Sequence, residues 1–139
     1  MSGNVFLDTN IIIYAYSLSD SKKQLIASEV LLNNDCTIST QVINEYCNVC
    51  FKKNLMHISE ILLDVDNILD ICELVKINET TIKQALLIKD SYGYSYYDSL
   101  ILSSALESNC SILYSEDLQH GQVIENSLKI VNPFSRVEV

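Results

Sequence analysis

Short apolar runs alternate with helical segments along this chain, and that alternation restricts the possible folds more than any other feature of the sequence. The runs cover residues 4–7, 36–39 and 111–114. Apolar runs of this length are typical of buried strands in a parallel sheet. Parallel strands need crossover connections, which helices normally provide. The order therefore predicts an α/β fold with three layers, α/β/α, around a short and mainly parallel central sheet.

Size and composition favour a single domain over residues 1–139. The chain is 48 % apolar and 19 % charged, which is typical of soluble globular proteins. Its apolar runs are far shorter than the ~20 residues that span a bilayer, so we expect no membrane segment. No basic region precedes the first apolar run, and the cysteines are odd in number, five. These features predict a cytoplasmic protein with free thiols.

Helical periodicity and turn residues predict the remaining elements. We expect a loop over 118–126 and a last strand over 128–131, at an edge of the sheet. Residues 73–77 form either a connector or a short strand. The helices are expected over residues 11–16, 21–32, 40–53, 57–72, 79–89 and 96–107. On the second and fourth of these helices the apolar stripes place four leucines toward the core, namely Leu25, Leu32, Leu62 and Leu69.

A carboxylate interrupts the most apolar of these helices. Asp98 shares one helical stripe with Ile101, Leu102 and Ala105. A buried charge needs a hydrogen bond, a proton or a cation, because an unpaired one costs several kcal/mol. The spacing Ser95-x-x-Asp98 also matches a capping box, in which an acid stabilises a helix start without any further function. The apolar neighbours favour an inward direction for the Asp98 side chain.

Acidic side chains also follow two of the predicted strands. Asp8 comes directly after the first apolar run, and Glu116 and Asp117 follow the third. The carboxyl ends of parallel strands are where open α/β sheets bind ligands. Asp8 could instead cap the next helix, together with Thr9 and Asn10. Since one such residue is enough for a cap, capping alone explains this triplet poorly.

A fourth acid, Glu45, lies just after the junction between the second strand and its helix. Taken alone it is more typical of a surface residue. The predicted topology nevertheless brings four carboxylates to one end of the sheet, namely Asp8, Glu45, Asp98 and Asp117. Clustered carboxylates repel one another and raise each other's pKa values, and a hard divalent cation such as Mg²⁺ or Mn²⁺ stabilises their ionised form. The two histidines are single and far apart, and no set of residues has zinc-site spacing.

The net charge of −9 argues against a protein that coats nucleic acid or binds anionic membranes. It does not exclude an enzyme that handles nucleic acid through metal ions, because the carboxylates of a metal site contribute to the same imbalance. Five lysines are candidates for contacts with a nucleic-acid backbone: Lys22, Lys23, Lys52, Lys53 and Lys89.

Four short acidic motifs occur in order along the chain: Leu7-Asp8-Thr9-Asn10, Asn44-Glu45-Tyr46, Tyr97-Asp98-Ser99-Leu100-Ile101 and Tyr114-Ser115-Glu116-Asp117-Leu118-Gln119-His120-Gly121. In order and spacing they resemble the acidic motifs of PIN-domain proteins. The likeness covers essentially the whole chain and is nearest to the ribonuclease toxins of bacterial and archaeal toxin–antitoxin pairs.

The resemblance implies a role for each matching residue. It implies a catalytic and metal-binding quartet: Asp8, Glu45, Asp98 and Asp117. The hydroxyls of Thr9 and Ser115 would support it by orienting carboxylates or water. Many members carry a further acid shortly after the Asp117 position, where this chain has Gln119 and His120. The number of metal ions and the role of Glu116 therefore stay open.

The same resemblance implies a PIN-like nuclease, a metal-dependent endoribonuclease. One or two Mg²⁺ or Mn²⁺ ions would activate a water for in-line attack on the scissile phosphate and leave 5′-phosphate and 3′-hydroxyl ends. The implied partners are an RNA substrate, a second copy of the chain in a homodimer, and an antitoxin whose tail packs on apolar helices and reaches the acidic site.

Two alternatives stay open at this point. The first is a catalytically silent PIN-fold module that binds a metal, RNA or a protein partner. The second is a phosphoryl-receiving regulatory domain of similar length and acidity. The second would need adjacent acids on the first strands and a lysine after a late strand. The lack of such a lysine near Ser115 disfavours it.

Overall fold

The computed structural model describes residues 4–17, 19–53 and 56–135. They form one six-stranded sheet in the order β3-β2-β1-β4-β6-β5. Every neighbouring pair is parallel except β5 and β6. The predicted α/β fold with a mainly parallel central sheet is therefore confirmed. The strands are β1 (Asn4–Leu7), β2 (Asp35–Ser39), β3 (Cys72–Val75), β4 (Ile112–Tyr114), β5 (Val123–Ile124) and β6 (Leu128–Val131).

The sheet ends differently from the prediction on one side. The edge beyond β6 is occupied by β5, which pairs Val123 with Lys129 and Ile124 with Leu128. The prediction that residues 128–131 form the edge was therefore wrong. Glu125 and Asn126 have φ values of 51° and 57°, and two successive positive φ values are typical of a tight hairpin turn. On the other side, the segment that followed the fourth helix is a strand, β3, parallel to β2.

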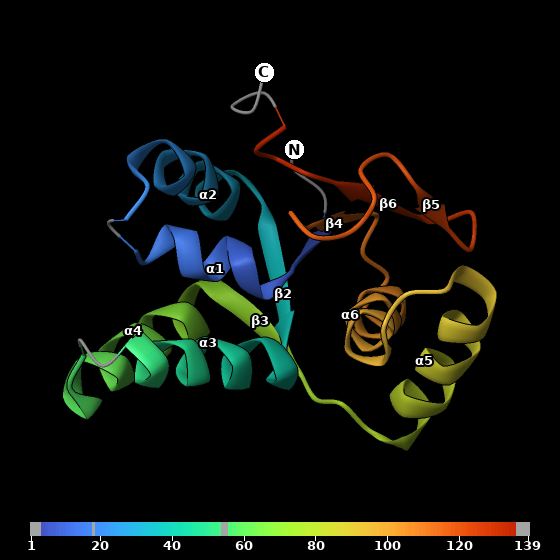
Figure 1. The fold of residues 1–139 in the computed structure, drawn as a ribbon, viewed down its shortest axis with the longest axis horizontal. Coiled ribbons are helices and arrows are strands. Elements are labelled where there is room, and N and C mark those ends of the chain that lie inside the picture. The colour runs from blue at the N-terminus through green and yellow to red at the C-terminus, as the bar shows by residue number, and fades with distance from the viewer. Residues whose placement is uncertain (1–3, 18, 54–55, 136–139) are drawn as a thin grey trace.

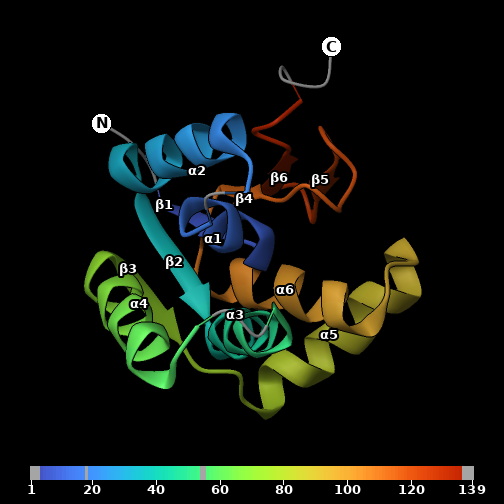
Figure 2. The same ribbon diagram turned by 60° about the vertical axis from the view of Figure 1, so that its left-hand side comes forward.

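Within the described ranges, six helices cover the two faces of the sheet. In Figure 1, α1, α2, α3 and α4 lie to one side of β2, and α5 and α6 lie together on the other side. Figure 2 shows α3 near the carboxyl end of β2 and next to α6. The helices are α1 (Thr9–Ala15), α2 (Ser21–Asn33), α3 (Thr40–Lys53), α4 (Ile58–Ile71), α5 (Glu79–Tyr92) and α6 (Tyr96–Glu107).

Side-chain caps set where several of these helices begin. Asp8 accepts a hydrogen bond from Thr9 N at the start of α1, and Asp20 accepts one from Lys23 N at the start of α2. Such caps satisfy amide groups that the first helical turn leaves without partners. Gly93 ends α5 with a φ of 78°, a left-handed conformation in which a glycine carries no steric penalty. Three residues later, at Tyr96, the chain enters α6, which carries Asp98.

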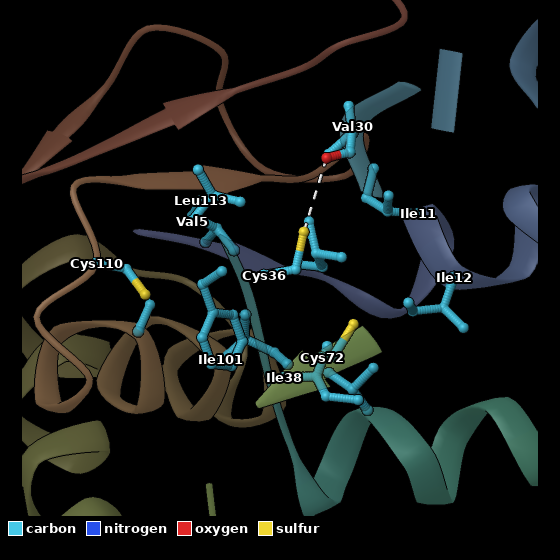
Figure 3. Packing of buried hydrophobic residues seen from close by; sticks show 14 of the residues in the cluster. Val5, Ile11, Ile12, Val30, Cys36, Ile38, Cys72, Ile101, Cys110 and Leu113 are labelled. Atoms are coloured by element: carbon cyan, nitrogen blue, oxygen red, sulfur yellow. Dashed lines mark hydrogen bonds between the residues drawn. The ribbon is translucent and has the colours of Figure 1, made fainter. Parts of the chain in front are cut away.

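The core lies between the sheet and both helical layers. Figure 3 shows side chains of β1, β2 and β4 meeting those of α1 and α6 around the centre of the sheet. Phe6, Ile38 and Leu113 come from three neighbouring strands and are 0 % exposed. Ile12 of α1 and Leu102 of α6 are also 0 % exposed and belong to the same cluster. The strands that carry the acidic motifs are thus held by the most buried part of the molecule.

Four leucines that the stripes place toward the core face outward instead. The exposed fractions are 67 % for Leu25, 83 % for Leu32, 57 % for Leu62 and 39 % for Leu69. Ala27 and Val30 are the buried residues of α2, and Ile61 and Ile68 are those of α4. Each helix therefore buries a narrower stripe than the sequence pattern suggests, because nothing in the described part of the chain packs on its outer flank. No helix among the described residues is both long and apolar enough to cross a membrane.

Replacing Ile38 by alanine should test the importance of the central strands. Ile38 is 0 % exposed in β2. Ile38→Ala removes buried apolar groups and leaves a cavity, so we expect it to lower the free energy of unfolding by about 2–5 kcal/mol. Leu63→Ala is the control, because Leu63 is 69 % exposed and should change that free energy by less than about 0.5 kcal/mol. Urea denaturation measures both, and equal effects of the two substitutions would contradict this account of the core.

Candidate active site

Four carboxylates line one hollow at the carboxyl end of the sheet. Its volume is about 300 Å³, and the acids that line it are Asp8, Glu45, Asp98 and Asp117. They come from the end of β1, from α3, from α6 and from the loop after β4. β1 and β4 are neighbours, with Leu7 in register with Tyr114, so the residues that follow both strands meet at one edge. The structure thus brings the four predicted residues together.

Asp8 is the most buried of the four, with 7 % of its surface exposed. One carboxylate oxygen accepts a hydrogen bond from Thr9 N at 2.7 Å, and the other accepts one from Ser115 Oγ at 2.7 Å. Burial, followed by repulsion from Asp117 and Asp98, raises the pKa of Asp8 from its usual 3.8 to about 6, although the two hydrogen bonds oppose this shift. Asp8 is therefore both the cap of α1 and a destabilised anion in the hollow.

The hydroxyls of Thr9 and Ser115 contact the carboxylates directly. Thr9 Oγ1 donates to Glu45 Oε1. Ser115 Oγ donates to Asp8 and accepts hydrogen bonds from Asp117 N at 3.2 Å and from Leu118 N at 3.3 Å. Ser115 thereby joins the buried acid to the turn that carries Asp117. This geometry is the one that a supporting role for the two hydroxyls requires.

Glu45 is half-buried at the hollow rather than on an open surface, so the surface position expected for it in isolation was wrong. Its partner is a residue that sequence reasoning missed. Gln41 lies one turn earlier on α3, and its Nε2 donates to Glu45 Oε2 at 3.4 Å and to the carbonyl oxygen of Tyr97 at 3.1 Å. The i, i+4 spacing of Gln41 and Glu45 was the signal that could have found it. Gln41 Oε1 is buried and has no hydrogen-bond partner among the described residues.

Asp98 is half-buried at the first turn of α6, and its carboxylate lines the hollow. Burial, followed by repulsion from Asp117 and Glu45, raises the pKa of Asp98, although hydrogen bonding with Ser95 opposes this shift. The capping-box alternative is met only in part. Asp98 N donates to Ser95 Oγ at 3.1 Å, so Ser95 caps the helix, but within the described residues no reciprocal bond joins the Asp98 carboxylate to Ser95 N. Ser95 therefore explains how the helix begins, while Asp98 is one of the residues that line the hollow.

Asp117 is the most exposed acid of the set and is held by a neutral side chain. Asn10 Nδ2 donates to Asp117 Oδ2 at 2.7 Å. Asn10 follows Asp8 and Thr9 in the sequence, and the alternative interpretation of these three residues was that they cap the next helix. Its amide instead fixes an acid 107 positions away in the sequence.

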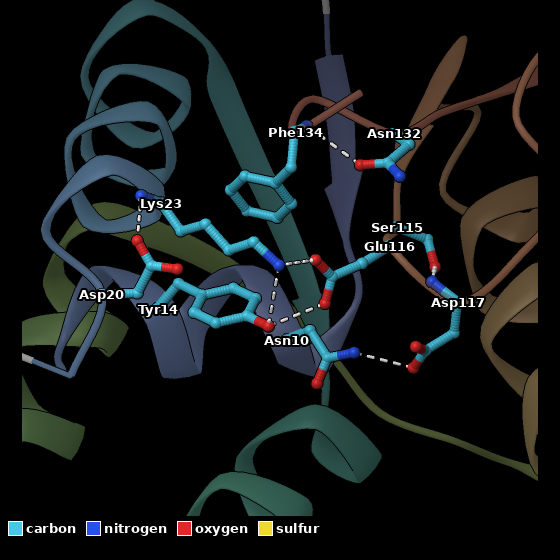
Figure 4. A network of polar contacts seen from close by, with 9 residues as sticks. All are labelled: Asn10, Tyr14, Asp20, Lys23, Ser115, Glu116, Asp117, Asn132 and Phe134. Atoms are coloured by element: carbon cyan, nitrogen blue, oxygen red, sulfur yellow. Dashed lines mark hydrogen bonds and ion pairs between the residues drawn. The ribbon is translucent and has the colours of Figure 1, made fainter. Parts of the chain in front are cut away.

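Glu116 lies outside the hollow. Figure 4 shows its side chain directed toward α2, where it forms an ion pair with Lys23 and accepts a hydrogen bond of 2.7 Å from the Tyr14 hydroxyl. Lys23 Nζ also lies over the rings of Tyr14 and Phe134, 4.8 and 5.4 Å from their centroids. The Glu116 carboxylate raises the pKa of Lys23. Lys23, predicted as a candidate backbone contact, is thus occupied by this network.

The donors around the hollow suit a hard divalent cation. The side-chain atoms there that can bind a metal ion are all oxygens, and the described residues that line the hollow include no lysine or arginine. Within the described ranges, no group of three His, Cys, Asp or Glu side chains is arranged as a ready ligand set. Mg²⁺, however, needs only one or two protein carboxylates, because it keeps several waters. Buried Asp8, its raised pKa and the unpartnered Gln41 Oε1 are all features that a bound cation with its waters would compensate.

The comparison with protein families agrees with this architecture. A family model for the PIN domain matches residues 5–125. The chain belongs to the PIN-domain family. A search of curated proteins finds no match. Among solved structures, the PIN fold of this chain is similar to that of VapBC2 from Rickettsia felis bound to a promoter DNA fragment, with 20 % identity, 93 % of this chain and 99 % of that chain covered, and a TM-score of 0.67.

Two further structures share the PIN fold at low identity. A toxin–antitoxin complex from Klebsiella pneumoniae is 19 % identical over 93 % of this chain and 97 % of that one, with a TM-score of 0.70. VapC20 of Mycobacterium tuberculosis, described as a toxin that cleaves the sarcin–ricin loop, is 16 % identical over 81 % and 89 %, with a TM-score of 0.65. At these identities the similarity concerns the fold.

Replacing Asp8 by asparagine should stabilise the metal-free protein at neutral pH. Since the folded-state pKa of Asp8 is raised from 3.8 to about 6, its contribution to stability is fully present below about pH 4 and is lost as the pH rises through about 6. At pH 7 in a chelator, Asp8→Asn should therefore raise the free energy of unfolding by up to about 3 kcal/mol. Thermal and urea unfolding at pH 4 and pH 7 measure the difference.

Asp66→Asn is the control for this comparison, since Asp66 is an exposed acid on α4. It should leave the pH dependence unchanged. An Asp8→Asn protein that loses stability equally at both pH values would show that the Asp8 carboxylate is not a destabilised anion.

Proposed function

We propose that this PIN-domain protein is a metal-dependent endoribonuclease that hydrolyses RNA phosphodiester bonds and acts as the toxin of a toxin–antitoxin pair. The observation that carries the proposal is the hollow itself. Four carboxylates from four separate elements line it, one of them is 7 % exposed, and the lining contains no basic residue from the described part of the chain. A purely structural acid cluster would gain more from ion pairing than from this arrangement.

The quartet is positioned by neutral hydrogen-bond donors. Asp8 is fixed by Ser115 and by the amide of Thr9, Glu45 by the Thr9 hydroxyl and Gln41, and Asp117 by Asn10. These donors orient the oxygens and leave their negative charge uncompensated by any basic group. Bound Mg²⁺ or Mn²⁺ would supply charge neutralisation and Lewis-acid chemistry at the scissile phosphate. Asp8, Glu45, Asp98 and Asp117 are the residues that would hold it.

Several features support the toxin assignment. The chain belongs to the PIN-domain family, and the similar structures include a toxin–antitoxin complex and a toxin described as cleaving the sarcin–ricin loop. The exposed leucines of α2 and α4 provide apolar surface of the kind that an antitoxin segment would cover. All five cysteines are unpaired, which agrees with a cytoplasmic location. A homodimer is part of the same proposal.

Replacing Asp98 by asparagine should abolish RNA cleavage. The substitution removes one carboxylate from the hollow at nearly constant size, so we expect cleavage to fall about a hundredfold or more without loss of folding. Chelation with EDTA should stop the wild-type reaction, and added Mg²⁺ or Mn²⁺ should restore it. Gel analysis of a structured RNA measures both effects, with Asp66→Asn as the control.

Undiminished cleavage by Asp98→Asn, or cleavage that persists in EDTA, would overturn the proposal. A protein that binds RNA but never cuts it under any of these conditions would support the silent binding module instead.

The two adjacent acids Glu116 and Asp117 should differ sharply. Asp117→Asn removes a carboxylate of the hollow, so cleavage should fall at least about tenfold. Glu116→Gln removes only the ion pair with Lys23, so cleavage should stay close to wild type while the protein loses about 1 kcal/mol of stability. Initial rates and urea unfolding of both variants test this. The reverse order of the two effects would mean that the Glu116 side chain enters the site in the active protein.

A further inference from the structure

We propose that a second hollow, directly beside the carboxylates, binds one unpaired base of the RNA against the ring of Tyr97. This inference rests on the proposed ribonuclease function and extends it by assigning a base subsite. The second hollow has a volume of about 420 Å³, within the range of small-molecule sites. It shares Gln41, Glu45 and Asn48 with the carboxylate hollow, so the two hollows are neighbours.

Tyr97 supplies the aromatic surface. Its side chain is 64 % exposed at the first turn of α6, one residue before Asp98. The ring contacts that of Tyr96 edge to face, with centroids 5.4 Å apart and an interplanar angle of 64°. The carbonyl oxygen of Tyr97 accepts a hydrogen bond from Gln41 Nε2 at 3.1 Å, so its backbone is tied to α3. An exposed ring on a fixed backbone is a suitable platform for stacking a base.

Three residues of α3 with side-chain amides line the same hollow as Tyr97. Gln41, Asn44 and Asn48 follow the i, i+3, i+7 spacing of one helical stripe, and all three line the hollow. In the described part of the chain, no hydrogen bond engages the amide of Asn44 or Asn48, and the buried oxygen Gln41 Oε1 has no partner. An amide presents both a donor and an acceptor, which matches the edge of a nucleobase.

The charge of this hollow favours a base over a phosphate. Among the described residues, its lining has no lysine or arginine, and Glu45 is the only charged residue there. A phosphate would be repelled there, whereas a neutral base can stack and form hydrogen bonds. Ile77 and Leu100 add apolar surface to the lining. The exposed amides of Asn44 and Asn48 each offer a donor and an acceptor, so the subsite can form hydrogen bonds with the edge of any of the four bases.

A mononucleotide probe tests the subsite without any cleavage. The probe is the 5′-monophosphate of 2-aminopurine riboside, whose fluorescence falls when its base stacks and which has no phosphodiester bond to cut. We expect saturable quenching by the wild-type protein and by Tyr97→Phe. Tyr97→Ala should weaken binding about tenfold. Phe51→Ala is the matched control, because Phe51 is an aromatic residue of α3 that is 55 % exposed and outside the hollow.

A separate set of variants tests the side-chain amides of α3. Asn44→Ala and Asn48→Ala should weaken binding of the probe, while Asn33→Ala, at the exposed end of α2, should not. On RNA, Tyr97→Ala should raise KM and shift the preferred cleavage positions while changing kcat little. Equal binding by wild type and Tyr97→Ala would overturn the subsite, and so would unchanged binding combined with loss of dimers, which would make Tyr97 a subunit contact.

The outcomes separate the subsite from the proposed function. If the wild-type protein binds the probe as described but cuts no RNA, the ribonuclease proposal fails and the base site stands. If the protein cuts RNA and Tyr97→Ala behaves as wild type in both assays, the base site alone is wrong. Circular dichroism of each variant confirms that it is folded before the comparison.

Discussion

The buried carboxylate of Asp8, held by Ser115 Oγ and Thr9 N, is the interaction on which the rest of this site depends. Through Ser115 it joins the end of β1 to the loop after β4, and through Thr9 it begins α1. Asp8 N also donates to the carbonyl oxygen of Tyr114 at 3.0 Å, which continues the pairing of the two strands. The pairing of β1 with β4 therefore also determines where Asp8 and the acids of the loop after β4 lie.

The loop after β4 shows how differently two neighbouring acids can be treated. The charge of Glu116 is neutralised by Lys23, in a partly buried pair with 18 % and 17 % of the two side chains exposed. The charge of Asp117 is held by an asparagine amide, which fixes its direction and leaves its charge intact. Glu116, which supports the loop, is paired with a lysine, whereas Asp117, which lines the hollow, is held by a neutral side chain. This contrast is the strongest physical argument that the hollow is built for a cation.

Much of this arrangement follows from the sequence because it depends on local rules. The alternation of apolar runs and helices predicts the parallel sheet, and acids placed just after strands must meet at one edge. The partners of those acids do not follow in this way. Asn10 contacts Asp117 across 107 positions, and Thr9 contacts Glu45 across 36. Such contacts depend on the packed positions of whole elements, which no local pattern contains.

The two wrong predictions, of the sheet edge and of the inward-facing leucines, also have physical causes. β5 has two residues, too few to show an alternating pattern, so the true sheet edge was not predicted. Leu25 and Leu32 fit a helical stripe, but a stripe says only that residues share a face and not how much of that face is covered. Sequence periodicity therefore predicted which face of a helix points toward the core better than it predicted how many residues of that face are buried.

The Lys23–Glu116 pair connects α2 to the loop that carries Asp117, and this widens the set of positions at which the protein is vulnerable. Tyr14 and Phe134 enclose the same ammonium group, so the loop is fastened from α1, α2 and the segment after β6 together. None of these three side chains lines the hollow. The loop that carries Asp117 is thus supported by side chains outside the hollow, so substitutions among them should lower the stability of the protein before they alter the hollow itself.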